Sequence, residues 1–131
     1  MKNFKNKVAA ITGAGSGMGQ QLAILLAKDG CHLSLSDVNE KGLADTVELV
    51  KAYNVRVTSK KVNVAKLEEI KAWAADTVQN HGSVNMIFNN AGVALGSTVE
   101  GANYEDLEWI MGINYWGVVY GTKEFLPYIK K

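Results

Sequence analysis

The chain has 131 residues, and its 14 basic and 13 acidic side chains leave a net charge of +1. A charge this close to zero argues against a nucleic-acid partner and an anionic membrane surface, so a small neutral or anionic ligand is the expected partner. The longest apolar stretches are far shorter than the roughly 20 residues that span a bilayer, and residues 1–7 are too polar for a signal peptide. We therefore expect a cytoplasmic protein with one domain, residues 1–131.

Cysteine and histidine are too sparse to indicate a metal site. The single cysteine, Cys31, cannot form an internal disulfide, and Cys31, His32 and His81 lack the spacing of zinc ligands. We expect Cys31 and His32 at the start of a strand and His81 in an exposed turn, and we predict no bound metal.

A glycine-rich stretch, residues 12–19 with the sequence TGAGSGMG, lies between two predicted elements. Before it, the apolar and β-branched run 8–12 predicts a strand buried on both faces of a parallel sheet. After it, apolar residues at helical spacing predict a helix over 18–28, which Gly30 would end. A strand that leads through glycines into a helix brings backbone N–H groups and the helix dipole to a pyrophosphate, so we predict a phosphate-binding turn.

The spacing of the glycines indicates which type of phosphate-binding turn this stretch forms. The pattern Gly-x-Gly-x-x-Gly would need glycine where the chain has Met18 or Gln20. A Walker A loop would need a lysine near its end, and none occurs between Lys7 and Lys28. The pattern that fits, Thr-Gly-x-x-x-Gly-x-Gly, resembles the cofactor turn of the short-chain dehydrogenase/reductase family. The alternative is a glycine-rich connection without a ligand. The resemblance implies a dinucleotide that contacts Gly13, Ser16, Gly17, Met18 and Gly19.

An acidic residue follows at the end of the next predicted strand. The segment 32–36 alternates in polarity and ends at Asp37, which completes a strand, helix and strand unit. Asp37 follows Gly19 by 18 residues, close to the interval at which a carboxylate reaches the hydroxyls of an adenosine ribose. The alternative is that Asp37 caps the helix predicted over 40–53, and the two roles are compatible.

The residues around Asp37 indicate which dinucleotide binds. A carboxylate at this place would repel a 2′-phosphate, and Ser16, Val38 and Asn39 supply no cation to neutralise one. We therefore predict NAD as the cofactor, with NADP less favoured. Val38 is expected beside the cofactor.

The segment 55–64 predicts a third strand, and its polar middle suits the edge of a sheet. In the family an aspartate often stands at the position of Asn63 and bonds the adenine amino group. Asn63 departs from that pattern, but its amide oxygen can accept from the same amine. Asn63 and Val64 are therefore expected to bind the cofactor. A helix over 66–80 follows, and Gly82 ends it.

A fourth predicted strand, 84–88, runs into Asn-Asn-Ala-Gly at 89–92, the second motif that resembles the family. Small residues after a strand permit close approach of the backbone to a ligand, and asparagine side chains can bond neighbouring backbone. Alone this is an ordinary turn sequence, but here it follows a strand at the edge where open α/β sheets bind ligands. The resemblance implies contact with the second ribose through Asn90, Ala91 and Gly92.

Residues 93–103 predict a loop, and from Tyr104 onward the chain predicts a helix with apolar side chains on nearly every side. Such a helix is buried in a large core or against another subunit. Members of the family commonly pair through this helix in a four-helix bundle. We therefore expect a homo-oligomer that forms through the helix from Tyr104 onward.

Asn114 is the polar residue of interest within that helix. The segment 113–117, Ile-Asn-Tyr-Trp-Gly, resembles the family's catalytic-asparagine segment, in which the asparagine sits at a bend and its backbone carbonyl holds a water of a proton relay. The resemblance implies a catalytic role for Asn114 and cofactor contact for Ile113. An asparagine in an apolar helix costs stability unless it is bonded, and the alternative is a kink stabilised by side-chain bonds to the backbone.

Together these elements predict an α/β fold, a Rossmann-like doubly wound parallel sheet in a three-layer arrangement, with strand order third, second, first, fourth. The motifs keep the family's order and spacing over essentially the whole chain. The resemblance implies an NAD-dependent oxidoreductase that transfers a hydride between nicotinamide and a small-molecule secondary alcohol or ketone.

The family's catalytic serine and its Tyr-x-x-x-Lys motif do not occur in the 131 residues. The favoured interpretation is the N-terminal half of a dehydrogenase, truncated after the fourth strand and the following long helix. The other is a complete chain that acts as a non-catalytic dinucleotide-binding module. In both cases we expect the 131-residue chain itself to be inactive.

Overall fold

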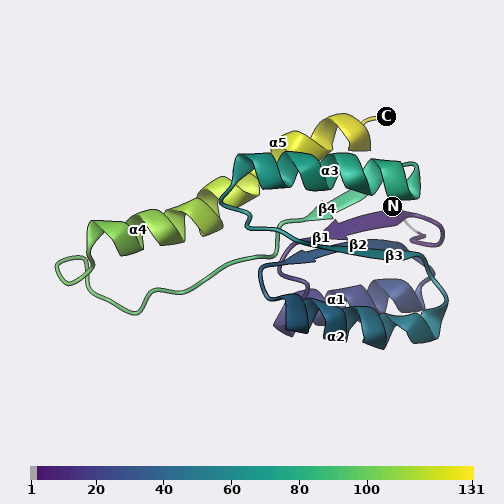
Figure 1. Ribbon diagram of the computed structural model, residues 1–131, viewed down its shortest axis with the longest axis horizontal. Coiled ribbons are helices and arrows are strands. Elements are labelled where there is room, and N and C mark those ends of the chain that lie inside the picture. The colour runs from purple at the N-terminus through teal and green to yellow at the C-terminus, as the bar shows by residue number, and fades with distance from the viewer. Residues whose placement is uncertain (1–2) are drawn as a thin grey trace.

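The computed structural model describes residues 3–131, and Figure 1 shows its ribbon. Four strands form one parallel sheet with the order β3-β2-β1-β4, as predicted. In this order the chain crosses the sheet in one direction from β1 to β3 and then returns to β4, so right-handed crossovers place the connecting helices on opposite faces. The strands are β1 (Val8–Ile11), β2 (His32–Asp37), β3 (Val57–Lys61) and β4 (Met86–Phe88).

Helices cover both faces of the sheet and give three layers (Figure 1). They are α1 (Gly17–Lys28), α2 (Glu40–Val50), the 3₁₀ helix η1 (Lys51–Tyr53), α3 (Leu67–His81), α4 (Tyr104–Met111), the π-helical segment η2 (Gly112–Trp116) and α5 (Gly117–Ile129). α1 and α2 lie on one face of the sheet, α3 and α5 lie on the other, and α4 extends beyond the sheet. The predicted Rossmann-like α/β architecture is therefore confirmed.

β1 lies at the centre of the core, because all four of its residues are buried. Side chains alternate along a strand, so β1 serves both layers. Ala9 and Ile11 point to one face of the sheet and pack in the cluster formed with α1 and α2. Ala10 points to the other face and packs in the cluster formed with α3 and α5. In the second cluster the rings of Trp73 and Phe125 meet edge to face with centroids 4.8 Å apart, which joins α3 to α5.

Several predicted elements are longer than the observed ones. The segment 55–64 contributes only β3, and 84–88 contributes only β4. β4 pairs with β1 from Ala9–Met86 to Ile11–Phe88, so its hydrogen-bonded length is limited by the short partner strand. The helix predicted over 40–53 is α-helical only to Val50 and then tightens into η1.

The exposed turn predicted at His81 is wrong. His81 is the last residue of α3, is only 8% exposed, and shares a hydrogen bond between its Nε2 and Thr58 Oγ1 at 2.8 Å. The helical period explains the difference, because His81 follows the buried residue Thr77 by four and so continues the inward face. Gly82, with φ of 81°, ends the helix one residue later.

The chain from Tyr104 onward stays helical through α4, η2 and α5. Within this described stretch the buried residues are Gly117, Gly121 and Phe125, whose spacing of four places them on one face. The other faces carry exposed large apolar side chains: Tyr104, Leu107, Trp109, Met111, Tyr115, Trp116, Val118 and Leu126. One sheet therefore does not bury the apolar surface of this helix.

No helix within residues 3–131 has the length and apolar character needed to cross a membrane.

Candidate functional site

A pocket of about 330 Å³ opens where β1, β2 and β4 reach their carboxyl ends. This is the point at which strand order reverses on either side of β1, and open α/β sheets bind ligands in the crevice there. The pocket is lined by Gly13, Ser16, Gly17, Met18, Asp37, Val38, Val62, Val64, Asn90, Ala91, Gly92, Val93 and Ile113.

The turn between β1 and α1 fits an anion. Gly17 begins α1 with φ of 54°, a left-handed backbone that residues with side chains rarely adopt. At Gly19 a Cβ atom would collide with the carbonyl oxygen of Gly13, so this approach of backbone to backbone requires glycine. Ser16, the N-cap, makes no side-chain cap bond in the described structure. The first N–H groups of α1, together with the helix dipole, are therefore suited to a phosphate.

The Asp37 carboxylate is held at the pocket wall by two backbone donors. The N–H of Gly15 donates to Oδ2 at 2.8 Å, and the N–H of Asn39 donates to Oδ1 at 2.9 Å. Asn39 itself caps α2, because its Oδ1 accepts from the N–H of Gly42 at 3.0 Å. The alternative role of Asp37 as that cap is therefore wrong. None of the described residues that line the pocket is a lysine or arginine.

The second motif ties the ends of β1 and β4 together. The side-chain amide of Asn90 donates to the carbonyl oxygens of Thr12 and Gly13 at 3.2 and 3.3 Å. The Thr12 hydroxyl accepts from the N–H of Ala91 at 2.9 Å and lies 3.3 Å from the carbonyl oxygen of Phe88, to which it donates. These bonds hold the glycine turn beside the Asn-Asn-Ala-Gly segment.

Asn114 lies on the π-helical segment η2 and not in the pocket wall. Its side chain bonds the backbone of Val93, in the loop after β4. Ile113, the residue before it, does line the pocket, as does Val93. π-Helical segments occur often at functional sites, and this one brings the helix from Tyr104 onward to the site.

The residues predicted to bind a cofactor lie in the pocket wall, with Gly19 and Asn63 as exceptions. Gly19 lies directly behind the wall, against the backbone of Gly13. Asn63 shapes the connection to α3, since its Oδ1 accepts from the N–H of Ala65 at 3.0 Å and its own N–H donates to Glu69 Oε1 at 2.9 Å. Contact of these residues with a cofactor stays a prediction.

Two residues of the wall, Val62 and Val93, were not predicted. A signal for Val62 exists in the sequence, because residues 62 and 64 share one face of an extended chain and Val64 was predicted. Val93 carries no such signal. It joins the wall because Asn114 fixes the loop that contains it.

The buried thiol of Cys31 does not line this pocket and has low reactivity. Burial raises its pKa to about 11, so the reactive thiolate is scarce at neutral pH. Within the described part of the chain, no group of three or more His, Cys, Asp or Glu side chains is arranged to hold a metal ion.

Comparison with known proteins agrees with the fold. Residues 7–131 match the short chain dehydrogenase family. The SadH protein of Mycobacterium tuberculosis (strain H37Rv) is 44% identical over 129 residues, which are 98% of this chain and 47% of SadH. This match includes nearly every residue described above.

Solved structures give the same result. A short chain dehydrogenase/reductase from Burkholderia phymatum in complex with NAD superposes with a TM-score of 0.95 at 37% identity, over 98% of this chain and 46% of that one. A NAD⁺-bound xylitol dehydrogenase superposes with a TM-score of 0.93 at 27% identity, over 98% of this chain and 50% of that one. The chain thus spans about half the length of these proteins. The chain belongs to the short-chain dehydrogenase/reductase family of oxidoreductases.

Proposed function

We propose that the pocket binds NAD, with the pyrophosphate at the start of α1. The turn residues Gly13, Ser16, Gly17 and Met18 would hold it through backbone N–H groups and the helix dipole, and Gly19 would let the turn close. The uncapped N-terminus of α1 and the left-handed backbone at Gly17 support this assignment.

The two ends of the dinucleotide are assigned to the two sides of the turn. Asp37 would bind the adenosine ribose, and Val38, Asn63 and Val64 would contact the adenine. The residues after β4 and at the start of η2 would contact the nicotinamide ribose: Asn90, Ala91, Gly92 and Ile113. The order of these residues around one pocket supports the assignment.

NAD is proposed over NADP on a single observation, the Asp37 carboxylate in a wall whose described residues include no lysine or arginine. Both carboxylate oxygens accept backbone bonds, which hold the side chain at the pocket wall. A 2′-phosphate brought to this wall would face like-charge repulsion, whereas two ribose hydroxyls can donate to the carboxylate.

The proposed activity of the complete protein is hydride transfer between nicotinamide and a secondary alcohol or ketone. Bound NAD supplies the hydride acceptor for such a reaction. The family resemblance assigns a catalytic role in proton transfer to the Asn114 segment. The bond between Asn114 and Val93 would then hold the loop beside η2 while the reaction proceeds.

A second candidate is a dinucleotide-binding module without redox chemistry. The observation that favours it is the absence from the sequence of a tyrosine followed four places later by lysine. The residues four places after Tyr53, Tyr104, Tyr115 and Tyr120 are Val57, Glu108, Val119 and Glu124. Dinucleotide binding is common to both candidates, and turnover by the natural full-length protein separates them.

Homo-oligomerisation through the helix from Tyr104 onward is also proposed. The exposed apolar side chains of α4, η2 and α5 support it. The cytoplasmic location stays a prediction from sequence, which fractionation of cells would test.

The cofactor proposal is tested by calorimetric titration of the chain with NAD and NADP. NAD should bind more tightly, and Asp37→Ala should narrow the difference between the two affinities. Asp45→Asn is the matched control, because Asp45 is an exposed carboxylate of α2 that pairs with Lys41 and does not line the pocket. Equal affinities, or tighter binding of NADP, would contradict the proposal.

A further inference from the structure

One peptide group lies between the pocket carboxylate and helix α2. The carbonyl oxygen of Ala14 accepts from the hydroxyl of Thr46 at 2.7 Å. The N–H of Gly15, which belongs to the same peptide group, donates to Asp37 Oδ2 at 2.8 Å. A trans peptide is planar, and its C=O and N–H point in opposite directions. Thr46 and Asp37 therefore hold opposite sides of one rigid group.

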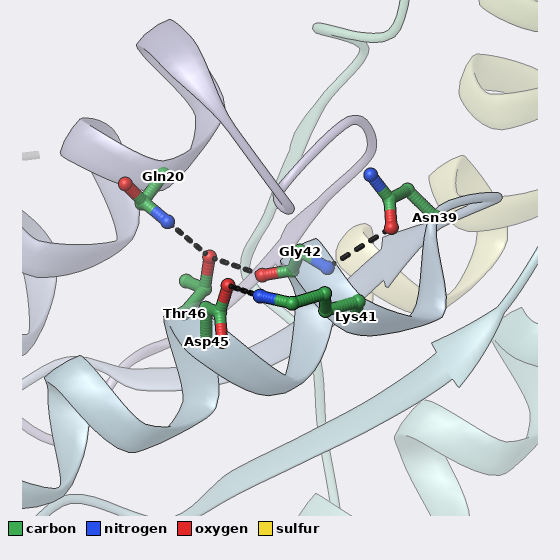
Figure 2. Close-up of polar contacts among 6 residues, drawn as sticks. All are labelled: Gln20, Asn39, Lys41, Gly42, Asp45 and Thr46. Carbon is green, nitrogen blue, oxygen red and sulfur yellow. Dashed lines mark hydrogen bonds and ion pairs between the residues drawn. The ribbon is translucent and has the colours of Figure 1, made fainter.

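The Thr46 hydroxyl is itself held in place. Figure 2 shows Gln20 reaching from α1 to Thr46 on α2, where its Nε2 donates to Oγ1 at 3.0 Å. Oγ1 also lies 3.2 Å from the carbonyl oxygen of Gly42, one turn earlier. A hydroxyl has one proton, and the shorter distance assigns it to Ala14. Thr46 is fully buried, so water cannot replace these partners.

The turn and α2 leave little room for the peptide group to move. A Cβ atom on Gly42 would lie 2.6 Å from the carbonyl oxygen of Gly15. A Cβ atom on Gly15 would lie 2.8 Å from Asp37 Oδ2 and 3.0 Å from the backbone nitrogen of Leu43. The two backbones are thus in direct contact, and Thr46 is the side chain of α2 that bonds the turn.

We propose that Thr46 is a positioning residue for the Asp37 carboxylate and acts on it through the Ala14–Gly15 peptide group. Thr46 does not line the pocket, so it touches no ligand. Its bond to Ala14 sets the plane of the peptide and, because bonds in series polarise one another, strengthens the Gly15 N–H as a donor. The inference rests on the proposed function, because the carboxylate concerned is the one assigned to the adenosine ribose.

Removal of the hydroxyl should therefore change ligand selectivity. Thr46→Val keeps the shape of the side chain but leaves the buried Ala14 carbonyl without its hydrogen-bond donor, which weakens the Gly15 N–H as a donor to Asp37. We expect NAD affinity to fall roughly tenfold, the equivalent of about one hydrogen bond, and NADP affinity to fall less. Thr46→Ser keeps the hydroxyl and should restore the wild-type ratio of the two affinities.

The test is calorimetric titration of wild-type chain, Thr46→Val and Thr46→Ser with NAD and NADP, with thermal unfolding of each variant alongside. A purely structural role would lower the melting temperature and leave the NAD to NADP affinity ratio unchanged. Thr46→Ala is the second hydroxyl-free variant, for use if valine does not fit the site. Asp45→Asn, which removes only the exposed pair with Lys41 seen in Figure 2, should leave the ratio unchanged.

A double-mutant comparison isolates the route of the effect. In an Asp37→Ala background, Thr46→Val should cause no further change in the ratio, because the group it positions is gone. If the wild-type chain binds NAD and the hydroxyl-free variants keep its selectivity, the Thr46 inference is overturned and the proposed function stands. If the wild-type chain binds neither dinucleotide, the proposed function fails and the inference fails with it.

Discussion

The side-chain amide of Asn114 pairs with the backbone of Val93 in both directions. Its nitrogen donates to the Val93 carbonyl oxygen at 2.8 Å, and its oxygen accepts from the Val93 N–H at 2.9 Å. The amide thus behaves like a neighbouring strand and joins the loop after β4 to η2. Because Val93 and Ile113 both line the pocket, this pair sets the distance between two parts of its wall.

Asn114→Leu should release the loop without unfolding the chain. Both bonds are solvent-exposed, so their loss should cost about 1 kcal/mol of local stability. Hydrogen exchange should show roughly tenfold faster exchange of the Val93 amide, with amides of β1 unaffected. Tyr115→Phe, at an exposed neighbouring position, is the control. Unchanged exchange at Val93 in the leucine variant would show that the pair does not hold the loop.

The sheet order was predictable because few topologies obey the rules for parallel strands. Right-handed crossovers and the run of strand and helix patterns leave the order β3-β2-β1-β4, which the structure confirms. The position of Asp37 in the pocket wall was predictable from the same topology. Asp37 ends a parallel strand, and ligands bind at the carboxyl ends of such strands.

Side-chain partners were not predictable from these patterns. Asp37 and Asn39 are both common helix caps, and only the path of the backbone decides that Asn39 caps α2 while Asp37 binds Gly15. The π-helical segment η2 carries no distinctive period, so Asn114 was expected at a bend without its partner Val93. Contacts between residues distant in sequence depend on the assembled fold.

The buried ring of His81 should make stability depend on pH. Burial lowers its pKa, and the nearby charges of Arg56 and then His32 lower it further. Its Nε2 shares a bond with Thr58, whereas the buried Nδ1 has no hydrogen-bond partner among the described residues. A proton on the folded ring would therefore be poorly accommodated.

The sign follows from the lowered pKa. Above about pH 6.5, the ordinary value for histidine, the ring is neutral in both the folded and the unfolded chain. As pH falls below that value the unfolded chain takes up the proton first, so the free energy of unfolding decreases. Urea unfolding at pH 7.5 and 5.5 should show this loss, and His81→Gln should reduce it. Equal pH dependence in both proteins would contradict the prediction.

The 131-residue chain alone should show no dehydrogenase turnover. The sequence lacks the family's Tyr-x-x-x-Lys, and general acid/base catalysis contributes typically 10² to 10⁴ in rate. A panel of secondary alcohols with NAD, followed by the absorbance of NADH, tests this expectation. Robust turnover would show that another group in these residues performs the proton transfer.

Self-association of the 131-residue chain is expected first from the sheet. β4 is the end strand of the order β3-β2-β1-β4, and its three residues, Met86–Phe88, are apolar. Natural edge strands are usually protected by charge, proline or a covering element, and β4 carries neither charge nor proline. An unprotected edge can pair with another copy.

The helix from Tyr104 onward gives the second and larger reason. Trp109, Met111, Tyr115 and Trp116 are each about half exposed. Neighbouring rings already pack edge to face, since the centroids of Tyr115 and Trp116 lie 5.1 Å apart with their ring planes at 89°. Apolar area of this kind on one helix is typical of a surface that packs against another subunit.

Sedimentation of the pure chain at micromolar concentration decides between association through this helix and a stable monomer. We expect dimers or larger species, and we expect the double variant Trp109→Glu/Trp116→Glu to shift the distribution toward monomer, because charges on both tryptophan positions would have to be buried on contact. Val99→Glu is the matched control, since Val99 is an apolar residue that is 95% exposed in the loop before α4. If the wild-type chain sediments as a monomer and unfolds cooperatively, the apolar helix is stable in water and does not need a second subunit to cover it.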